Sequence, residues 1–270
     1  MPEFVCIGVP YFLGQRLDER TEVAAVRASG IAQDLGAEWV EVTPDTAIDP
    51  DPVTAVNRAL AESIAAHRDR FPIIFAADCT SAIGAAKGLM SAEGLGMVWL
   101  DAHGDFNTPE TTPSGFLGGM PLAMLVGRGE QVLLDGVGLA PLREADITLT
   151  DARDLDPGEA VALRESALTH LPDLRDLMTA PLPDKPLYVH LDVDVVNPEQ
   201  MPAMSYAAPG GPSLEETAAA VRRVARDGRV AGLLLGLWND DLATDDRPLQ
   251  GTLALVRAFV EGYRALSRSV

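Results

Sequence analysis

Short apolar segments alternate along the chain with longer stretches of helical periodicity, and this alternation constrains the fold more than any other feature. It predicts a parallel sheet whose two faces are covered by helices. The expected strands are residues 4–9, 38–43, 72–77, 96–100, 146–150, 187–193 and 231–237. The expected helices are residues 24–35, 52–67, 81–90, 214–226 and 248–266. We therefore predict an α/β fold, with one three-layer α/β/α domain over residues 1–270 and a central, mostly parallel sheet.

The charge balance argues against nucleic acid as a partner. Asp and Glu number 40 against 21 for Lys and Arg, a formal net charge of -19, and such a surface repels a phosphate backbone. The N-terminal segment lacks the features of a secretory signal, and no apolar run approaches the roughly 18 residues that span a bilayer. We expect a soluble, cytoplasmic protein that binds neither nucleic acid nor a membrane. The chain ends soon after its last expected helix, which favours a monomer.

Three potential metal ligands stand at alternate positions directly after one expected strand. Asp101, His103 and Asp105 follow the apolar segment 97–100, and period-two spacing puts them on one side of extended backbone. Asp192 and Asp194 end a second apolar run at the same spacing. Buried carboxylates at strand ends repel one another strongly unless cations neutralise them. Four aspartates and one imidazole suit a pair of divalent ions, with manganese a natural choice for this oxygen-rich set.

A third expected strand ends beside Cys79, whose sulfur could complete the set of ligands. Taken singly, each of these residues has a simpler explanation: solvated aspartates often begin loops after strands, and an isolated Cys79 is often an inert core thiol. That explanation suits Asp192 and Asp194 poorly, because they lie in a Val/Leu run that otherwise looks buried. His190 has the same strand parity as these aspartates and is a candidate for a supporting contact behind the ligands.

These motifs resemble, in matching order, those of the ureohydrolase family of arginases and agmatinases. Residues 101–105 match its DAHxD motif, residues 191–194 with Pro198 nearly match S-x-D-x-D-x-x-D-P, and residues 77–81 stand where the family has GGDHS. The resemblance, from about residue 71 to residue 239, implies the α/β/α arginase fold and two Mn²⁺ ions. By this resemblance Asp101 and Asp192 would bridge the ions, Cys79 and Asp105 would complete one, and His103 and Asp194 the other. A bridging hydroxide would be the nucleophile, and Asp105 would accept its hydrogen bond.

The same resemblance covers residues for the amino-acid part of a small substrate. Asn107 and Ser114 lie in the expected loop 107–119, at positions where arginases contact the substrate's α-carboxylate. Residues 153–159 resemble the arginase segment R-D-x-D-P-G-E, so Asp156 would receive the α-ammonium. A helix N-cap role for Asp156 is an equally good alternative, and the two roles can coexist. Because agmatine lacks an α-carboxylate, these residues favour an arginine-like amino acid.

Four departures from the family pattern cluster at the reactive end of the substrate. Cys79 replaces the histidine of GGDHS, and a softer, anionic thiolate would make its metal less Lewis acidic. Gly118 stands in place of the histidine credited with proton shuttling, Leu237 in place of the glutamate that pairs with the guanidinium, and Asn197 in place of an aspartate. A charged guanidinium without its carboxylate would incur a desolvation penalty of several kcal/mol. We therefore expect the reactive end to be neutral.

N-hydroxylation lowers the basicity of a guanidine, so Nω-hydroxy-L-arginine meets this requirement. The predicted activity is that of a dinuclear metal amidinohydrolase releasing hydroxyurea and L-ornithine. One alternative is an arginase that acts on L-arginine despite its altered surroundings, and another is a catalytically silent metal-binding pseudoenzyme. Asp105, Asn107 and Ser114 weigh against the pseudoenzyme, because an idle site needs neither a hydroxide-orienting carboxylate nor head-group contacts.

Overall fold

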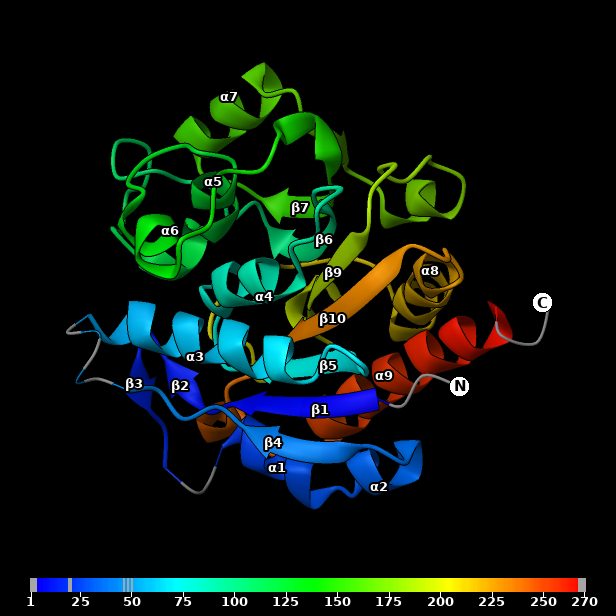
Figure 1. Cartoon of the computed structure of the whole chain (residues 1–270). Helices are drawn as coiled ribbons and strands as arrows, with labels where there is room; N and C mark the ends of the chain where they lie inside the picture. Colours follow the sequence, from blue (N-terminus) through cyan, green and yellow to red (C-terminus); the bar gives the residue numbers. More distant parts are fainter. Residues whose placement is uncertain (1–3, 19–20, 46, 48, 50, 267–270) are drawn as a thin grey trace.

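The computed structural model describes residues 4–18, 21–45, 47, 49 and 51–266. Within these residues an eight-stranded sheet has the order β4-β1-β5-β10-β9-β6-β7-β8, and every pair of neighbours is parallel (Figure 1). The strands are β1 (Phe4–Val9), β4 (Glu38–Glu41), β5 (Phe71–Ala76), β6 (Gly96–His103), β7 (Ile147–Asp154), β8 (Thr169–Leu171), β9 (Leu187–Asp192) and β10 (Val230–Gly236). A small antiparallel pair, β2 (Tyr11–Phe12) and β3 (Gln15–Arg16), follows β1.

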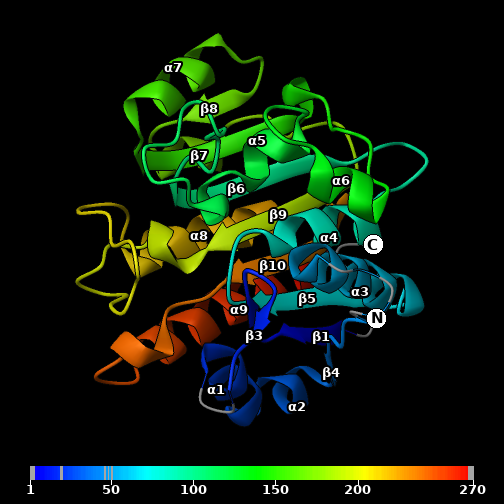
Figure 2. The same cartoon turned by 90° about the vertical axis from the view of Figure 1, so that its left-hand side faces the viewer.

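Helices cover both faces of this sheet, which confirms the predicted α/β/α class (Figures 1 and 2). One apolar core lies under α1 (Glu22–Ala28), α2 (Ile31–Leu35), α8 (Leu214–Ala225) and α9 (Arg247–Leu266). The other lies under α3 (Pro52–Ala66), α4 (Ser81–Leu89), α5 (Pro121–Leu125), α6 (Val132–Val137) and α7 (Pro157–Glu165). Short 3-10 helices are η1 (Leu117–Gly119), η2 (Glu144–Asp146), η3 (Leu174–Met178), η4 (Val193–Val195) and η5 (Asp240–Leu242).

Local sequence signals explain where the main helices begin and end. Asp51 caps α3, its carboxylate accepting a hydrogen bond from the Thr54 backbone at 2.8 Å, and Pro52 occupies the first turn. Ser213 and Glu216 form a capping box at the start of α8. The expected helix over residues 24–35 is wrong in one respect: Gly30, with φ of 80°, separates α1 from α2. A left-handed residue interrupts the hydrogen-bond ladder, so the chain turns there.

Several elements were absent from the sequence-based expectation because they are too short for a periodic pattern. They are β8, the β2–β3 pair and the helices α5 and α6. In contrast, β6 runs three residues past its expected end and includes His103. Because neighbouring strands are parallel, β5, β6, β9 and β10 all end at the same edge of the sheet. That edge therefore gathers the polar residues that follow each strand.

Among the described residues, no helix is both long and apolar enough to cross a membrane.

Candidate metal centre

Two groups of potential metal ligands meet at the carboxyl ends of β5, β6 and β9. In each group the ligand atoms lie within 4.8 Å of one another. The first group consists of Cys79, Asp101, His190 and Asp192, and the second consists of Asp101, His103 and Asp194. Asp101 belongs to both groups, so the two are contiguous. Five of the six metal ligands expected from the sequence, all except Asp105, fall in these groups.

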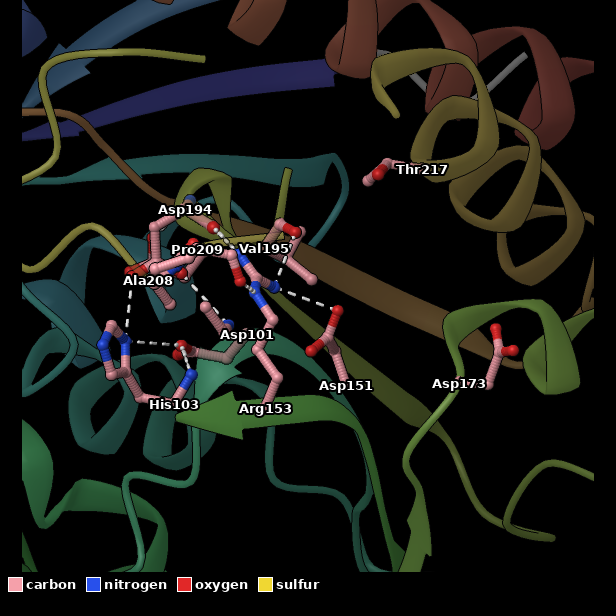
Figure 3. Close-up of polar contacts among 12 residues, drawn as sticks. Asp101, His103, Asp151, Arg153, Asp173, Asp194, Val195, Ala208, Pro209 and Thr217 are labelled. Atoms are coloured by element: carbon pink, nitrogen blue, oxygen red, sulfur yellow. Dashed lines mark hydrogen bonds and ion pairs between the residues drawn. The ribbon is translucent and has the colours of Figure 1, made fainter. Parts of the chain in front are cut away.

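The backbone of β6 and the turn after β9 fix the second group. His103 donates its backbone N–H to Asp101 at 2.7 Å, and its Nδ1 lies 2.9 Å from Asp194 and 3.4 Å from Asp101 (Figure 3). Asp192 caps the 3-10 turn η4, within which the backbone N–H of Asp194 donates to the carboxylate of Asp192 at 2.9 Å. The Ala102 backbone N–H donates to the carboxylate of Asp194 at 3.1 Å, which ties the two strand ends together.

Burial and mutual repulsion hold the carboxylates in an electrostatically unfavourable state. Burial raises the pKa of Asp101 and of Asp194, and it raises the pKa of Asp192 to about 7, with Asp194 adding to the shift. Burial alone would lower the pKa of His103, but hydrogen bonds to Asp101 and Asp194 raise it to about 12. One positive imidazole cannot balance this many acids. The donor set fits divalent cations, which would restore the anionic form of each carboxylate.

Cys79 lies against Asp192, to which its thiol donates a hydrogen bond at 3.2 Å. Burial, together with the nearby charges of Asp105, Asp192 and Asp101, raises the pKa of this thiol well above its usual value. A thiol among carboxylates resists ionisation, whereas a bound cation stabilises the thiolate. The position of Cys79 therefore suits a metal ligand better than a nucleophile.

Asp105 lies outside both ligand groups although it lines the same cavity. Its backbone carbonyl accepts hydrogen bonds from Leu122 and Ala123 at 3.0 and 3.1 Å, and its φ is 48°. The carboxylate is buried, and its Oδ2 has no hydrogen-bond partner among the described residues. Burial and the charge of Asp101 raise the pKa of this group well above its usual value. An unpartnered buried carboxylate oxygen facing the cavity is free to accept from a bound molecule.

His190 is the residue that sequence reasoning placed only behind the ligands. It is fully buried, it contributes a nitrogen to the first group, and burial lowers its pKa to about 3. Its parity with Asp192 was the signal in the sequence. That parity gave the face of the strand but not the distance to Cys79, which depends on how β5 and β9 are placed across β10.

A cavity of about 560 Å³ opens over the ligand groups. The aromatic residues Phe12, Phe116 and Tyr206 line it, and so do the expected head-group residues Asn107, Ser114 and Asp156. The amide of Asn107 donates to Asp156 at 2.9 Å. Asp156 and Glu159 form a capping box at the start of α7, so the N-cap alternative describes a real contact. Asp156 also faces the cavity, which leaves it available to a ligand.

The residues at the reactive end differ in placement from the sequence-based expectation. Leu237 does not line the cavity; it is 8% exposed and packs in the apolar core on the α8–α9 side of the sheet. Gly236 is the residue of β10 beside the site, since a Cβ there would lie 2.5 Å from Asp192. The ring of Phe116 occupies the space next to Gly118. Among the described residues that line the cavity, none comes from β10, so this strand contributes no acid to the cavity wall.

Arg153, at the end of β7, binds the turn that carries Asp194. Its guanidinium donates to the backbone carbonyls of Asp194 and Val195 at 3.1 and 3.0 Å (Figure 3). It also donates to the carbonyls of Ala208 and Pro209 and to the carboxylate of Asp151. The role of Arg153 was not apparent from the sequence, because its partners are main-chain atoms far away along the chain.

Comparisons with known proteins agree with this geometry. A family model described as the arginase family matches residues 15–235. The arginase of Bacillus caldovelox is 32% identical over 253 residues, which cover 81% of this chain and 85% of that protein. The arginase of Bacillus subtilis is 32% identical over 180 residues, 61% of each protein. The crystal structure of arginase from Bacillus cereus superposes with a TM-score of 0.84 at 26% identity, covering 96% of this chain and 98% of that one.

Proposed function

This chain belongs to the arginase family of dinuclear metal ureohydrolases, and from that premise we propose that it hydrolyses the guanidino carbon of an arginine-like amino acid. The proposed substrate is Nω-hydroxy-L-arginine and the products are hydroxyurea and L-ornithine. The proposed activity is that of the Nω-hydroxy-L-arginine hydrolase of D-cycloserine biosynthesis. The single observation that carries the hydrolytic proposal is the convergence of the two ligand groups on one cavity.

The proposed cofactor is a pair of Mn²⁺ ions, because carboxylates dominate the donor set. Asp101 and Asp192 would help to hold both ions, Cys79 and Asp105 would help to hold one, and His103 and Asp194 the other. When bound, two such ions would lower the pKa of a shared water toward neutrality, which would supply a nucleophile near pH 7. The unpartnered oxygen of Asp105 would accept the hydrogen bond that orients this water.

The head group of the substrate would be held by Asp156, Asn107 and Ser114. Asp156 offers a carboxylate to the α-ammonium, while Asn107 and Ser114 offer donors to the α-carboxylate. These groups line the same cavity as Cys79, Asp101, His103, Asp192 and Asp194. An amino acid bound this way would present its side-chain end to the metal centre.

The neutral reactive end is supported by the lack of an acid from β10 in the cavity wall. A guanidinium there would lose its hydration without gaining a carboxylate from β10, at a cost of several kcal/mol. An uncharged hydroxyguanidine avoids this cost. In the proposed reaction the oxygen of water bonds to the guanidino carbon, the bond from that carbon to the ornithine nitrogen breaks, and the leaving amine takes up a proton.

L-arginine is a second candidate substrate, because the relatives that match this chain are named arginases. A product assay separates the two. Manganese-loaded protein is offered L-arginine, Nω-hydroxy-L-arginine and agmatine in parallel, and urea, hydroxyurea and the amines are quantified. We expect hydroxyurea and L-ornithine to form fastest, and agmatine to react least. Faster turnover of L-arginine would contradict the neutral-substrate proposal, and no turnover of any amidine would contradict the hydrolytic one.

A further inference from the structure

A pair of stacked rings lies two residues before the carboxylates of Asp101 and Asp192, on β6 and β9 respectively. Trp99 and His190 are paired in register, their ring centroids are 3.6 Å apart, and their planes differ by 9°. Both side chains are fully buried. The indole Nε1 of Trp99 donates to Asp101 at 3.1 Å, so this pair directly supports the ligand groups.

The two nitrogens of the His190 ring have different surroundings. Nδ1 lies 3.2 Å from the hydroxyl of Tyr188, which is two residues earlier on the same strand. Nε2 is buried and has no hydrogen-bond partner among the described residues. A ring nitrogen withdrawn from water without a partner is destabilising. The fold therefore maintains an unsatisfied donor or acceptor beside the metal centre.

The position of His190 gives this nitrogen a partner when a cation is present. One nitrogen of His190 lies within 4.8 Å of Cys79 Sγ and of carboxylate oxygens of Asp101 and Asp192. Tyr188 engages Nδ1, so Nε2 is the atom left for a metal. A histidine held through one nitrogen by an oxygen atom while the other nitrogen binds metal is the usual arrangement in metal sites.

We propose that His190 binds, through Nε2, the same metal ion as Cys79, Asp101 and Asp192. The inference rests on the proposed dinuclear site and deepens it. One half of the site would offer a sulfur, a nitrogen and carboxylates, whereas the half formed by His103, Asp101 and Asp194 would offer a nitrogen and carboxylates only. The sulfur-containing half is the softer of the two and would prefer Co²⁺ or Zn²⁺ over Mn²⁺ more strongly than the other half does.

The full chain loaded with two equivalents of Co²⁺ provides the test. X-ray absorption at the cobalt edge counts sulfur and imidazole scatterers directly. We expect one sulfur and two imidazoles, His103 and His190, for each pair of ions. A single imidazole for each pair would overturn the proposal, and this outcome needs no variant.

The variant His190→Phe keeps the aromatic stack on Trp99 and removes both nitrogens. We expect it to lose one imidazole from the spectrum and to bind one of the two Co²⁺ ions about tenfold or more weakly in competition with a chelator. Tyr188→Phe is the matched control, because it changes a buried residue of the same strand and keeps the imidazole of His190. It should retain two imidazoles in the spectrum. Unchanged affinity for both ions in His190→Phe would overturn the proposal. Circular dichroism checks that each variant is folded.

Failure of this inference is distinguishable from failure of the proposed function. If the protein releases hydroxyurea but shows one imidazole for each pair of ions, only the proposed role of His190 is contradicted. Two imidazoles in a protein that hydrolyses no amidine would support the role of His190 and contradict the proposed function.

Discussion

Arg153 donates a hydrogen bond to the backbone carbonyl of Asp194 at 3.1 Å (Figure 3). Arg153 lies at the end of β7 and Asp194 follows β9, and β6 separates these two strands in the sheet. The contact acts on the main chain of Asp194, while the carboxylate of the same residue faces His103 at 2.9 Å. A side chain outside the ligand groups thus determines where a member of those groups can lie.

Replacing Arg153 by Met should destabilise the protein and weaken the metal centre. The change leaves buried carbonyls and the carboxylate of Asp151 without their donor, which should cost about 3 kcal/mol or more. Urea unfolding with and without Mn²⁺ measures both effects, and the stabilisation given by the metal should shrink. Arg175→Met is the control: its partner Asp173 is exposed, so less than about 1 kcal/mol should be lost. Equal losses in the two variants would contradict the role of Arg153.

Replacing Cys79 by His should shift the substrate preference toward L-arginine. A neutral imidazole in place of a thiolate leaves more positive charge on the metal, which strengthens its Lewis acidity. We expect the ratio of kcat/KM for L-arginine to that for Nω-hydroxy-L-arginine to rise about tenfold, equal to about 1.4 kcal/mol of barrier. Steady-state assays with both substrates measure it. Cys79→Ser, which loses the sulfur without gaining a nitrogen, should show no such rise; an unchanged ratio in the His variant would count against the account of the pocket.

Replacing Leu237 by Glu should destabilise the fold and leave arginine binding unimproved. Leu237 packs in the apolar core, so a carboxylate there would be buried without a partner, at about 3 kcal/mol or more. Leu242→Glu is the control, because Leu242 is 51% exposed and should change stability by less than about 0.5 kcal/mol. Thermal and urea unfolding give the comparison. A stable Leu237→Glu protein with a lower KM for L-arginine would restore the sequence-based placement of this residue at the reactive end.

Glu22 predicts a pH dependence of stability. Burial raises the pKa of this carboxyl from 4.5 to about 7. Between these values the unfolded chain ionises while the folded chain keeps the proton, so the stabilising contribution is complete below pH 4.5 and is lost as the pH rises to about 7. The shift corresponds to about 3 kcal/mol. Glu22→Gln should therefore gain stability relative to the unmodified chain between pH 5 and pH 8 in urea unfolding, whereas Glu62→Gln on the exposed face of α3 should not. A pH-independent difference would refute the assignment.

The alternation of apolar and helical segments was sufficient to predict a parallel sheet with seven of its eight strands, most of the helices and the edge at which the ligands gather. Period-two spacing also gave the correct face for Asp101 with His103, and for Asp192 with His190. These are local properties, set by backbone geometry within one strand.

Placement across strands was harder to predict. Leu237 was expected at the reactive end, yet it follows the last residue of β10 and packs on the opposite side from Gly236. A shift of one position reverses the face, and the sequence offers no marker of where the strand ends. The distance of His190 from Cys79 and the contacts of Arg153 likewise depend on strand order and on main-chain atoms, neither of which a sequence pattern specifies.

The hydrogen bond from Asn107 to Asp156 has a consequence for the thermodynamics of binding. Asp156 is fixed at the start of α7 by its capping box, and Asn107 also accepts a hydrogen bond from Thr111 at 2.9 Å. Neither side chain must surrender rotational freedom when a ligand arrives, so little ordering entropy opposes capture of an amino-acid head group. The contribution of the head group to affinity should thus be largely enthalpic. A ligand with a shorter side chain should keep nearly the same contribution from its head group.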